Sequence, residues 1–349
     1  MIFRKNCHII VIKIDVQGNA FMSFQGFRRH PSNYLRKCKP AFLGMIFGAT
    51  FDVCNRKDRL AEFLADPRTF ASRNWLGRFF GPQASASPDL LVSVILATRN
   101  NERTLESAVR SLLDQTHRNL DVIVVNDASD DGSVALLEKM ARSDARLRVF
   151  NNEIRLGTGH SRNRGLQEAR GDFVTFQDGD DYSEPDRIAR QLAALTAAPG
   201  RKLCLCNYVR VDDQDIVLTV NDRRVMKCIV SMMFPRREVV ERIGYFVPET
   251  VGEDSEYYER IKIAFGKESE VVVFATLYRA LFSAGSSLFS GTHVARCGVK
   301  AVRYTRTASD QKHWDGLLKR LDEIRRGKRD IYVACSETPG SRRLLSGFE

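Results

Sequence analysis

The sequence predicts an α/β protein in which a mostly parallel β-sheet carries helices on both faces. From residue 91 onward, short apolar runs rich in β-branched residues alternate with segments of helical periodicity. Repeated strand–helix units of this length favour crossover connections, which set parallel strands side by side and cover both faces with helices. The chain has 349 residues, of which 43% are hydrophobic, so it can bury a substantial core.

The first half of the alternating region supplies four strands and four helices. In the segment 102–115, Leu105, Val109 and Leu112 lie on one stripe, as in an amphipathic helix. For the last helix of the four we expect Ser183 as N-cap residue and Pro185 in the first turn. The predicted strands are Leu91–Ala97, Val122–Val125, Leu147–Phe150 and Phe173–Phe176, and the predicted helices are Glu102–Gln115, Val134–Ala141, Gly159–Ala169 and Pro185–Leu195.

Beyond residue 200 the pattern changes toward antiparallel pairing. Two β-rich runs flank the polar turn Asp212–Asp215 and read as a hairpin. Further strands and helices follow at lower regularity. The predicted elements here are the hairpin strands Lys202–Val211 and Ile216–Val220, the helix Tyr257–Ile263 and the strand-like run Val271–Leu277. The runs Cys228–Phe234 and Arg236–Ile243 lie between the hairpin and the helix and receive no assignment.

Charge and linker composition divide the chain into four segments. A small, polar stretch flanked by proline, Gly81–Pro88, reads as a linker, and a helical pattern precedes it at Asp58–Phe80. We expect a basic extension at 1–89 that is helical near its end, two halves of the working domain at 90–200 and 201–294, and a basic helical extension at 295–349. The flanks hold 14 basic against 6 acidic and 13 against 7 side chains, whereas the middle holds 27 against 30.

The basic flanks predict a surface for an anionic partner, either membrane headgroups or another acidic molecule. Solvated helices with excess arginine are the alternative. No run approaches the about 18 to 20 apolar residues that a membrane span needs, and the first 24 residues lack the apolar core of a secretory signal. The eight cysteines are scattered without a CxxC pair, which favours free, mostly buried thiols. We therefore expect a cytoplasmic protein with peripheral contact at the inner face of the membrane.

Polar loops follow each of the first four predicted strands. Because ligands of parallel α/β sheets bind beyond the carboxyl ends of the strands, these loops are where a site is expected. The sequence contains neither a glycine-rich dinucleotide fingerprint after the first strand nor a GxxxxGK[ST] loop. A nicotinamide enzyme and a P-loop nucleotidase are both disfavoured.

The loop after the fourth strand is acidic. Asp178, Asp180 and Asp181 place three carboxylates within four residues, and their mutual repulsion would be relieved by a divalent cation. Oxygen ligands suit Mg²⁺ or Mn²⁺, which commonly bridge to substrate phosphates. The alternative is an acidic turn that leads into a helix, whose N-terminus favours carboxylates.

Four ordered motifs give residues 92–195 a family resemblance. They are Val-Ser-Val-Ile-Leu-Ala-Thr-Arg-Asn at 92–100, Val-Val-Asn-Asp-Ala-Ser-Asp-Asp-Gly-Ser at 124–133, Arg-Leu-Gly-Thr-Gly-His-Ser-Arg-Asn-Arg-Gly at 155–165 and Phe-Gln-Asp-Gly-Asp-Asp at 176–181. In this order they resemble the nucleotide-sugar-binding half of a family 2 glycosyltransferase of the GT-A fold. The resemblance implies a Rossmann-like sheet, a nucleotide-diphospho-sugar donor and a bound Mn²⁺ or Mg²⁺.

The resemblance assigns roles to individual residues. It implies that Asp127 contacts the nucleotide base, usually uracil, although Asn126 stands where the family often has aspartate. Arg162 corresponds to the helix arginine near the diphosphate. The donor-binding set that the resemblance implies is Thr98, Asn100, Glu102, Asp127, Arg162, Asp178, Gly179 and Asp180, and the metal ligands are Asp178, Asp180 and the adjoining Asp181. The structural alternatives are an Asx turn at Asp127 and Asp130, and an ion pair between Arg162 and Glu168.

The acceptor side resembles the same family at Gly252-Glu253-Asp254. In the family an aspartate of such a pair, at a helix start, is the catalytic base, so Asp254 is the candidate base and Glu253 its neighbour. Helix capping by Asp254 is the alternative. A sugar hydroxyl needs a carboxylate to accept its proton, and one base opposite the leaving group gives a single displacement with inversion. Tyr278-Arg279 and Ser283–Ser287 resemble the closing segment, where arginine or serine touches phosphate.

The sequence therefore predicts an inverting, metal-dependent glycosyltransferase that moves a sugar, expected to be UDP-linked, to a hydroxyl of a glycan or lipid-linked glycan in cell-surface polysaccharide biosynthesis. Two alternatives stay open: a catalytically inactive relative that serves as a scaffold module in glycan assembly, and a nucleotidyltransferase. Nucleic acid is not an expected partner, because no RRM, zinc or helix-turn-helix signature accompanies the charge.

Overall fold

The computed structural model describes residues 2–5, 8–14, 20–25, 88–247, 252–282, 292–296, 300–335 and 341–344. The chain divides into two compact units, residues 1–84 and 85–349. The described residues of the first unit form an antiparallel sheet of β1 (Ile2–Lys5), β2 (His8–Ile14) and β3 (Ala20–Gln25). The helix expected at 58–80 and the linker 81–87 lie outside the described residues, and the four-segment division stays a prediction.

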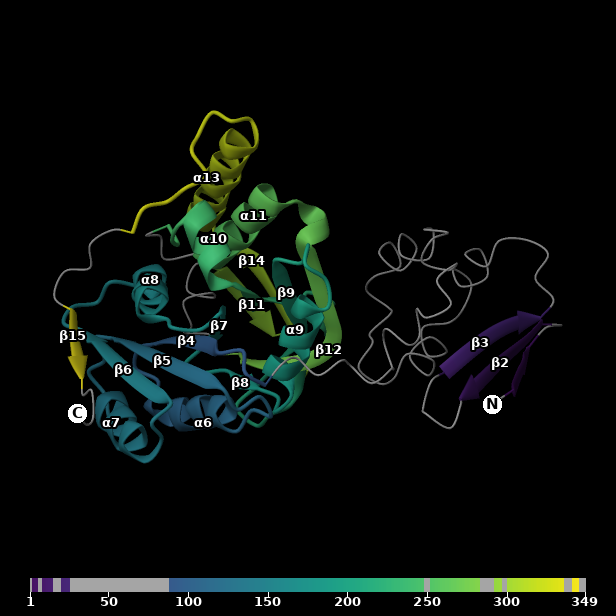
Figure 1. The fold of residues 1–349 in the computed structure, drawn as a ribbon, viewed down its shortest axis with the longest axis horizontal. Helices are drawn as coiled ribbons and strands as arrows, with labels where there is room; N and C mark the ends of the chain where they lie inside the picture. The colour runs from purple at the N-terminus through teal and green to yellow at the C-terminus, as the bar shows by residue number, and fades with distance from the viewer. Residues whose placement is uncertain are drawn as a thin grey trace. The chain divides into compact units, whose positions relative to one another are not determined.

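The second unit is built on a mixed sheet that joins all of its described strands (Figure 1). The strand order is β13-β14-β10-β9-β11-β7-β4-β5-β6-β15, and β12 pairs with β8 and β9. The strands are β4 (Val92–Thr98), β5 (Leu120–Asp127), β6 (Leu147–Asn152), β7 (Phe173–Asp178), β8 (Tyr182–Ser183), β9 (Leu203–Val211), β10 (Val217–Val220), β11 (Met226–Pro235), β12 (Glu270–Leu281), β13 (Thr292–Arg296), β14 (Ala301–Arg306) and β15 (Ser341–Leu344).

The first four strands of this unit, β4, β5, β6 and β7, are mutually parallel as predicted, and β9 and β10 form the expected hairpin. The helices are α6 (Glu102–Leu113), α7 (Ser133–Ser143), α8 (Thr158–Glu168), α9 (Arg187–Thr196), α10 (Arg236–Ile243), α11 (Glu253–Phe265), the 3₁₀ turn η2 (Lys267–Ser269) and α13 (Ala308–Arg325). The α/β class and the C-terminal helix are thus confirmed. The hairpin β13–β14 and the edge strand β15 were not predicted.

Successive side chains of the central strands pack alternately into two hydrophobic cores, one on each face of the sheet. Val94 and Leu96 of β4 belong to the core shared with α6 and α7, whereas Ile95 belongs to the core shared with α8 and α11. Figure 1 shows α6 and α7 on the face opposite α8. Because both faces are covered, the strands are buried along almost their whole length, which is why they read as continuous apolar runs.

The start of α9 differs from the prediction. The helix begins at Arg187 with Asp186 as its N-cap residue, so the assignment of Ser183 as N-cap residue was wrong. Ser183 instead lies in β8, opposite Tyr278 of β12, and its hydroxyl donates to the side chain of Gln177. Because Ser183 is paired in the sheet and its hydroxyl is hydrogen-bonded to Gln177, it does not cap the helix.

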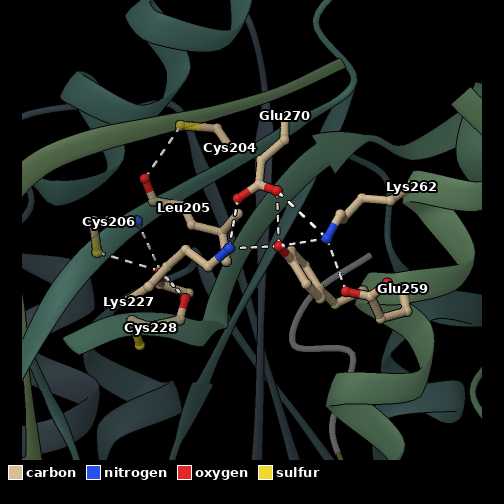
Figure 2. Close-up of polar contacts among 10 residues, drawn as sticks. Cys204, Leu205, Cys206, Lys227, Cys228, Glu259, Lys262 and Glu270 are labelled. Carbon is tan, nitrogen blue, oxygen red and sulfur yellow. Dashed lines mark hydrogen bonds and ion pairs between the residues drawn. The ribbon is translucent and has the colours of Figure 1, made fainter. Parts of the chain in front are cut away.

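Ion pairs and hydrogen bonds fix α11 against its neighbours. Lys227 Nζ donates to Glu270 Oε1 at 2.7 Å, and the Tyr258 hydroxyl donates to Glu270 Oε2 at 2.7 Å (Figure 2). Arg260, which is fully buried, pairs with Glu256 at 2.7 Å and donates to the carbonyl groups of 243, 245 and 331. A buried guanidinium with so many acceptors sets the position of the helix closely.

Three cysteines lie in the core beside this cluster (Figure 2). Cys204, Cys206 and Cys228 are buried free thiols, and Cys206 lies opposite Cys228 across the β9–β11 pair. Burial raises the pKa of the Cys206 thiol, so it behaves as a small apolar group. The prediction of free, buried thiols is confirmed for these residues. Within the described ranges, no helix combines the length and apolar character that crossing a bilayer requires.

Candidate active site

The carboxyl ends of β4, β5 and β7 bring three of the predicted loops to one edge of the sheet. Thr98 lies beside Asn126 in the β4–β5 pair, and Ala97 lies beside Asp178 in the β4–β7 pair. The strand-end side chains are therefore neighbours although they are up to 81 residues apart. This is the edge at which a parallel α/β sheet binds its ligands.

The first two loops are joined by Asn100 and Glu102. Asn100 donates to Asp130 Oδ1 at 2.6 Å and accepts from the Asp130 backbone N–H at 3.0 Å. Glu102 Oε2 accepts from the backbone N–H of Gly132 at 3.1 Å. In the structure, both residues shape the rim of the site. Asp130, which was considered for an Asx turn with Asp127, is hydrogen-bonded to Asn100 instead.

Gly179 lets the acidic loop approach the first loop closely. A Cβ atom at Gly179 would lie 2.5 Å from Thr98 Oγ1 and 2.7 Å from Asn101 Nδ2, so no larger residue fits without movement. Thr98 is buried, and its Oγ1 accepts from Asn101 Nδ2 at 3.2 Å. The backbone carbonyl of Gly179 accepts from Thr104 Oγ1 at 3.3 Å. The glycine between the two aspartates is thus explained by packing.

Asp127 ends β5 with its carboxylate buried under the loop that leads into α8. Oδ1 accepts from Asn152 Nδ2 at 2.9 Å and from the backbone N–H of Leu156 at 2.8 Å, and Oδ2 accepts from Gly157 N–H at 2.8 Å. The Asx turn with Asp130, which was the structural alternative, does not account for the position of this carboxylate. The carboxylate fixes the loop at the start of α8, and base contact by Asp127 stays a prediction.

Replacing Asp127 by asparagine is expected to destabilise the fold by about 1–3 kcal/mol, because the new NH₂ group would face donors in place of an acceptor. Urea unfolding measures this loss. Asp130→Asn is the matched control: Asp130 is exposed and its acceptor atom survives the change, so a loss below about 0.5 kcal/mol is expected. Equal midpoints for the two variants would contradict this role of Asp127.

The three aspartates of the acidic loop have different surroundings. Burial, reinforced by the charge on Asp178, raises the pKa of Asp180 to about 6. Asp181 is buried, accepts from the Tyr278 hydroxyl at 2.8 Å and from Leu281 N–H at 2.9 Å, and thereby ties the loop to β12. Burial and the charges of Asp180 and Asp178 raise the pKa of Asp181 well above its usual value. Asp181 is therefore held by protein groups, whereas Asp178 is one-third exposed.

Arg162 joins the acidic loop to α11. Its Nη2 donates to Asp178 Oδ1 at 2.9 Å and its Nη1 donates to Glu253 Oε1 at 2.8 Å, while its guanidinium lies 5.8 Å from the Phe246 ring centroid. Burial works to lower the pKa of Arg162, but Asp178, Glu253 and Asp254 together raise it above its ordinary value. The pair with Glu168 considered from the sequence does not form; Glu168 pairs with Arg148 instead.

Glu253 and Asp254, in the first turn of α11, differ in exposure. Glu253 is buried, and burial raises its pKa to about 7, with Arg162 opposing the shift and Asp254 adding to it. Asp254 is half-buried, and its Oδ1 accepts from the Ser255 backbone N–H at 2.6 Å. Gly252 is the N-cap residue of the helix, so the capping alternative for Asp254 is wrong. Of the two carboxylates, Asp254 is the more exposed.

The donor set of this site suits a divalent cation shared with a substrate. Across the residues that the structure describes, no three His, Cys, Asp or Glu side chains are grouped so that they could hold a metal ion by themselves. Asp178 and Asp180 offer two carboxylates, and the pKa of Asp180 is raised to about 6 first by burial and then by the charge on Asp178. Mg²⁺ and Mn²⁺ commonly use one or two carboxylates together with substrate phosphates, so the residues fit such an ion once a diphosphate is bound.

Sequence reasoning missed the long-range partners of the site. Tyr278 was noticed only beside Arg279, but its hydroxyl also accepts from Asp178 N–H at 3.2 Å, so it holds the acidic loop at two points. Arg279 donates to Glu184 and Asp215 at 2.7 and 2.6 Å, and the segment Ser283–Ser287 lies outside the described residues. Local sequence patterns cannot predict a contact such as that of Tyr278 with Asp181, which is 97 residues away.

Comparison with known proteins shows that part of the second unit matches a known family. Residues 93–242 match the sequence profile "Glycosyl transferase family 2". EpsH, a candidate glycosyltransferase of Bacillus subtilis, is 37% identical over 139 residues, which are 38% of this chain and 40% of EpsH. TuaG, a candidate teichuronic acid biosynthesis glycosyltransferase of the same organism, is 37% identical over 102 residues, covering 29% of this chain and 40% of TuaG.

The chain thus spans about two fifths of the length of the curated relatives it matches. Among solved structures, S. aureus TarS in complex with UDP-GlcNAc aligns with a TM-score of 0.47 and 23% identity, over 59% of this chain and 62% of TarS. The mannosyltransferase PcManGT of Pyrobaculum calidifontis, in complex with GDP-Man and Mn²⁺, aligns with a TM-score of 0.46 and 18% identity, over 70% and 68%.

Proposed function

Because residues 93–242 form a glycosyl transferase family 2 domain, we propose that this chain moves a sugar from a nucleotide-diphosphate donor to a hydroxyl group of a glycan. The observation that carries the proposal is the bridge made by Arg162, which binds Asp178 of the donor side and Glu253 of the acceptor side at 2.9 and 2.8 Å. A sugar transferase needs a diphosphate site and a base within one sugar's length of each other. Arg162 brings the two regions into contact.

We assign the donor to the edge formed by the β4, β5 and β7 loops, with Thr98, Asn100 and Glu102 at the nucleoside end. The donor is a UDP-sugar in this proposal. The Asp127 carboxylate, which accepts from Leu156 N–H and Gly157 N–H in the structure, is proposed to contact its base. Asp178 and Asp180 would hold a divalent cation beside the diphosphate. When bound, that cation stabilises the negative charge of the departing nucleoside diphosphate.

Asp254 is proposed to accept the proton of the attacking hydroxyl. Its half-buried carboxylate lies next to Glu253, whose contact with Arg162 holds the helix start against the donor side. One base and one leaving group on opposite faces of the sugar give inversion at the anomeric carbon. Arg162, fully used by two carboxylates, is a positioning residue in this assignment, and its expected contact with the diphosphate requires that one of these pairs opens.

Cell-surface polysaccharide assembly is the proposed setting, supported by the teichuronic acid relative. The acceptor is then a glycan or lipid-linked glycan, and the basic flanks provide contact with the inner face of the membrane. A scaffold role without catalysis finds no support in the site, since Asp178, Asp180 and Asp254 are all in place. A nucleotidyltransferase finds none in the family match.

Calorimetric titration with UDP tests the donor site. UDP is expected to bind about tenfold or more tightly when Mn²⁺ or Mg²⁺ is present, because a cation held by the two aspartates would offset the negative charge of the diphosphate. Asp180→Ala should remove the dependence on metal. Asp186→Ala, which changes an aspartate at the start of α9 that is about half exposed, should preserve it. If neither the metal nor Asp180→Ala changes the affinity for UDP, the metal assignment is refuted.

A further inference from the structure

A single hydroxyl group holds both ends of the acidic loop. The hydroxyl of Tyr278, in β12, accepts from the Asp178 backbone N–H at 3.2 Å and donates to Asp181 Oδ2 at 2.8 Å. A phenol hydroxyl offers one donor and an acceptor oxygen, and both are used here. Because Asp178 and Asp181 stand at the two ends of the loop, the hydroxyl fixes how far apart these ends lie.

Asp181 is bound on every side by the protein. Its Oδ1 accepts from the Leu281 N–H at 2.9 Å, so each carboxylate oxygen has a partner in β12. The backbone carbonyl of Asp181 accepts from Gln177 Nε2 at 3.1 Å, and its N–H donates to the Asp178 carbonyl at 3.2 Å. Asp181 is buried, whereas Asp178 and Asp180 are partly exposed. The last two carboxylates are therefore the ones that a ligand of the loop can use.

The ring of Tyr278 is itself held in place. It is buried, and the guanidinium of Arg187 lies 5.7 Å from the ring centroid, where a cation is attracted to the aromatic face. Arg187 is fully buried. It donates to Thr175 Oγ1 at 3.2 Å and to the Phe176 carbonyl at 3.4 Å, both in β7, the strand that leads into the acidic loop. The tyrosine hydroxyl is therefore presented from a well-fixed side chain.

The strand that supplies this hydroxyl lies beyond the family segment. β12 begins at Glu270, whereas the match to the family profile ends at residue 242. β12 reaches the acidic loop because it pairs with β8, which follows the loop directly, and Tyr278 lies opposite Ser183 in this pair. The Glu184 N–H donates to the Leu277 carbonyl at 3.0 Å and extends the contact. The acidic loop is thus positioned by chain about 100 residues further on.

We propose that Tyr278 is a positioning residue for the donor site, and that Asp181 acts together with it rather than as a ligand of the cation. The hydroxyl holds the loop so that Asp178 and Asp180 keep one arrangement before a donor binds. Such preorganisation lowers the cost of ordering the two carboxylates around a cation. The inference rests on the proposed function, because it concerns the same site. Loss of the hydroxyl should weaken donor binding only when a cation takes part.

Calorimetric titration of the full chain with UDP, in MnCl₂ and in EDTA, tests this role without any turnover. In Tyr278→Phe the gain in UDP affinity from Mn²⁺ should fall from about tenfold to about threefold, while affinity in EDTA stays within about twofold of the unaltered chain. Tyr257→Phe is the matched control, because Tyr257 is also buried and its hydroxyl donates to the Gly244 carbonyl at 3.0 Å rather than to the acidic loop. Its gain from Mn²⁺ should stay at about tenfold.

Two failures can be told apart. If Mn²⁺ strengthens UDP binding equally in Tyr278→Phe and in the unaltered chain, the positioning role is overturned while the proposed metal site stands. If Mn²⁺ has no effect on the unaltered chain, the proposed metal site fails and this inference fails with it. Hydrogen exchange adds a readout without any ligand: the Asp178 N–H should exchange faster in Tyr278→Phe than in Tyr257→Phe, because it has lost its acceptor. Equal exchange in the two variants also overturns the role.

A double-mutant cycle tests the assignment of Asp181. Asp181→Asn should also lower the gain from Mn²⁺ to about threefold, because its NH₂ group would face a donor where an acceptor is needed. Tyr278→Phe and Asp181→Asn break the same contact, so the two together should lower the gain no further than either alone. If the two losses multiply and the gain disappears, Asp181 binds the cation independently of Tyr278, and the assignment is wrong.

Discussion

Asp254→Asn is expected to lower turnover about 10²- to 10⁴-fold, the usual contribution of a general base, while UDP affinity stays within about twofold of the unaltered chain. The carboxylate is removed, but asparagine keeps an oxygen that can accept the Ser255 backbone N–H, now at 2.6 Å. The first turn of α11 therefore keeps its geometry. The thermal unfolding midpoint should not move, so that lost activity reports lost chemistry.

Release of UDP from a panel of nucleotide sugars, with and without acceptor, measures this effect. Glu268→Gln is a suitable control, because Glu268 is an exposed carboxylate just beyond the far end of the same helix. Its activity should be normal. Full activity of Asp254→Asn would remove Asp254 as the base, whereas loss of UDP binding in that variant would mean that the residue serves the donor site instead.

Arg162→Met is expected to destabilise the fold by about 3–5 kcal/mol, because it leaves the buried Glu253 and the partly buried Asp178 without their cation. Arg162→Lys should recover only part of this loss. A single ammonium group cannot reach both carboxylates with the two-pronged geometry of a guanidinium. The loss should appear as a lower midpoint in urea unfolding and as lower activity.

Arg110→Met supplies the comparison, since Arg110 pairs with Glu106 on the exposed face of α6 and should contribute only about 0.3–0.5 kcal/mol. Adding Glu253→Gln to Arg162→Met should restore part of the stability, because one unpaired charge disappears. If Arg162→Met costs no more than Arg110→Met, the bridge between the two sides of the site is not energetically important.

Sequence periodicity predicted the central sheet well because its strands are buried on both faces. Runs such as Val92–Leu96 are short and continuously apolar, so they lack the three-to-four-residue spacing of a helix. Parallel pairing follows from the helices between these strands. The same reasoning could not find β15, a four-residue strand whose partner β6 lies about 190 residues earlier. It also misplaced the start of α9, since the two-residue strand β8 is defined only by its pairing with β12.

For the candidate site, the sequence predicted which residues gather but not how they pair. The loops after β4, β5 and β7 meet because parallel strands end at one edge. The partner of Arg162 could not be predicted, because Glu168 is a plausible neighbour on the same helix while Glu253 is 91 residues away. The same holds for Asp127, whose hydrogen bonds run to backbone groups of a loop 29 and 30 residues further on.

The contacts of Arg260 have a consequence for the division of labour in this molecule. The buried Arg260 side chain donates to carbonyl oxygens at the end of α10 and at residue 331. The helix that carries Asp254 is therefore held by segments that precede it and follow it in the sequence. A fragment limited to residues 93–242 would lack Arg260 and the three carbonyl groups that it binds. The helix that carries Asp254 therefore depends for its position on chain beyond the family segment.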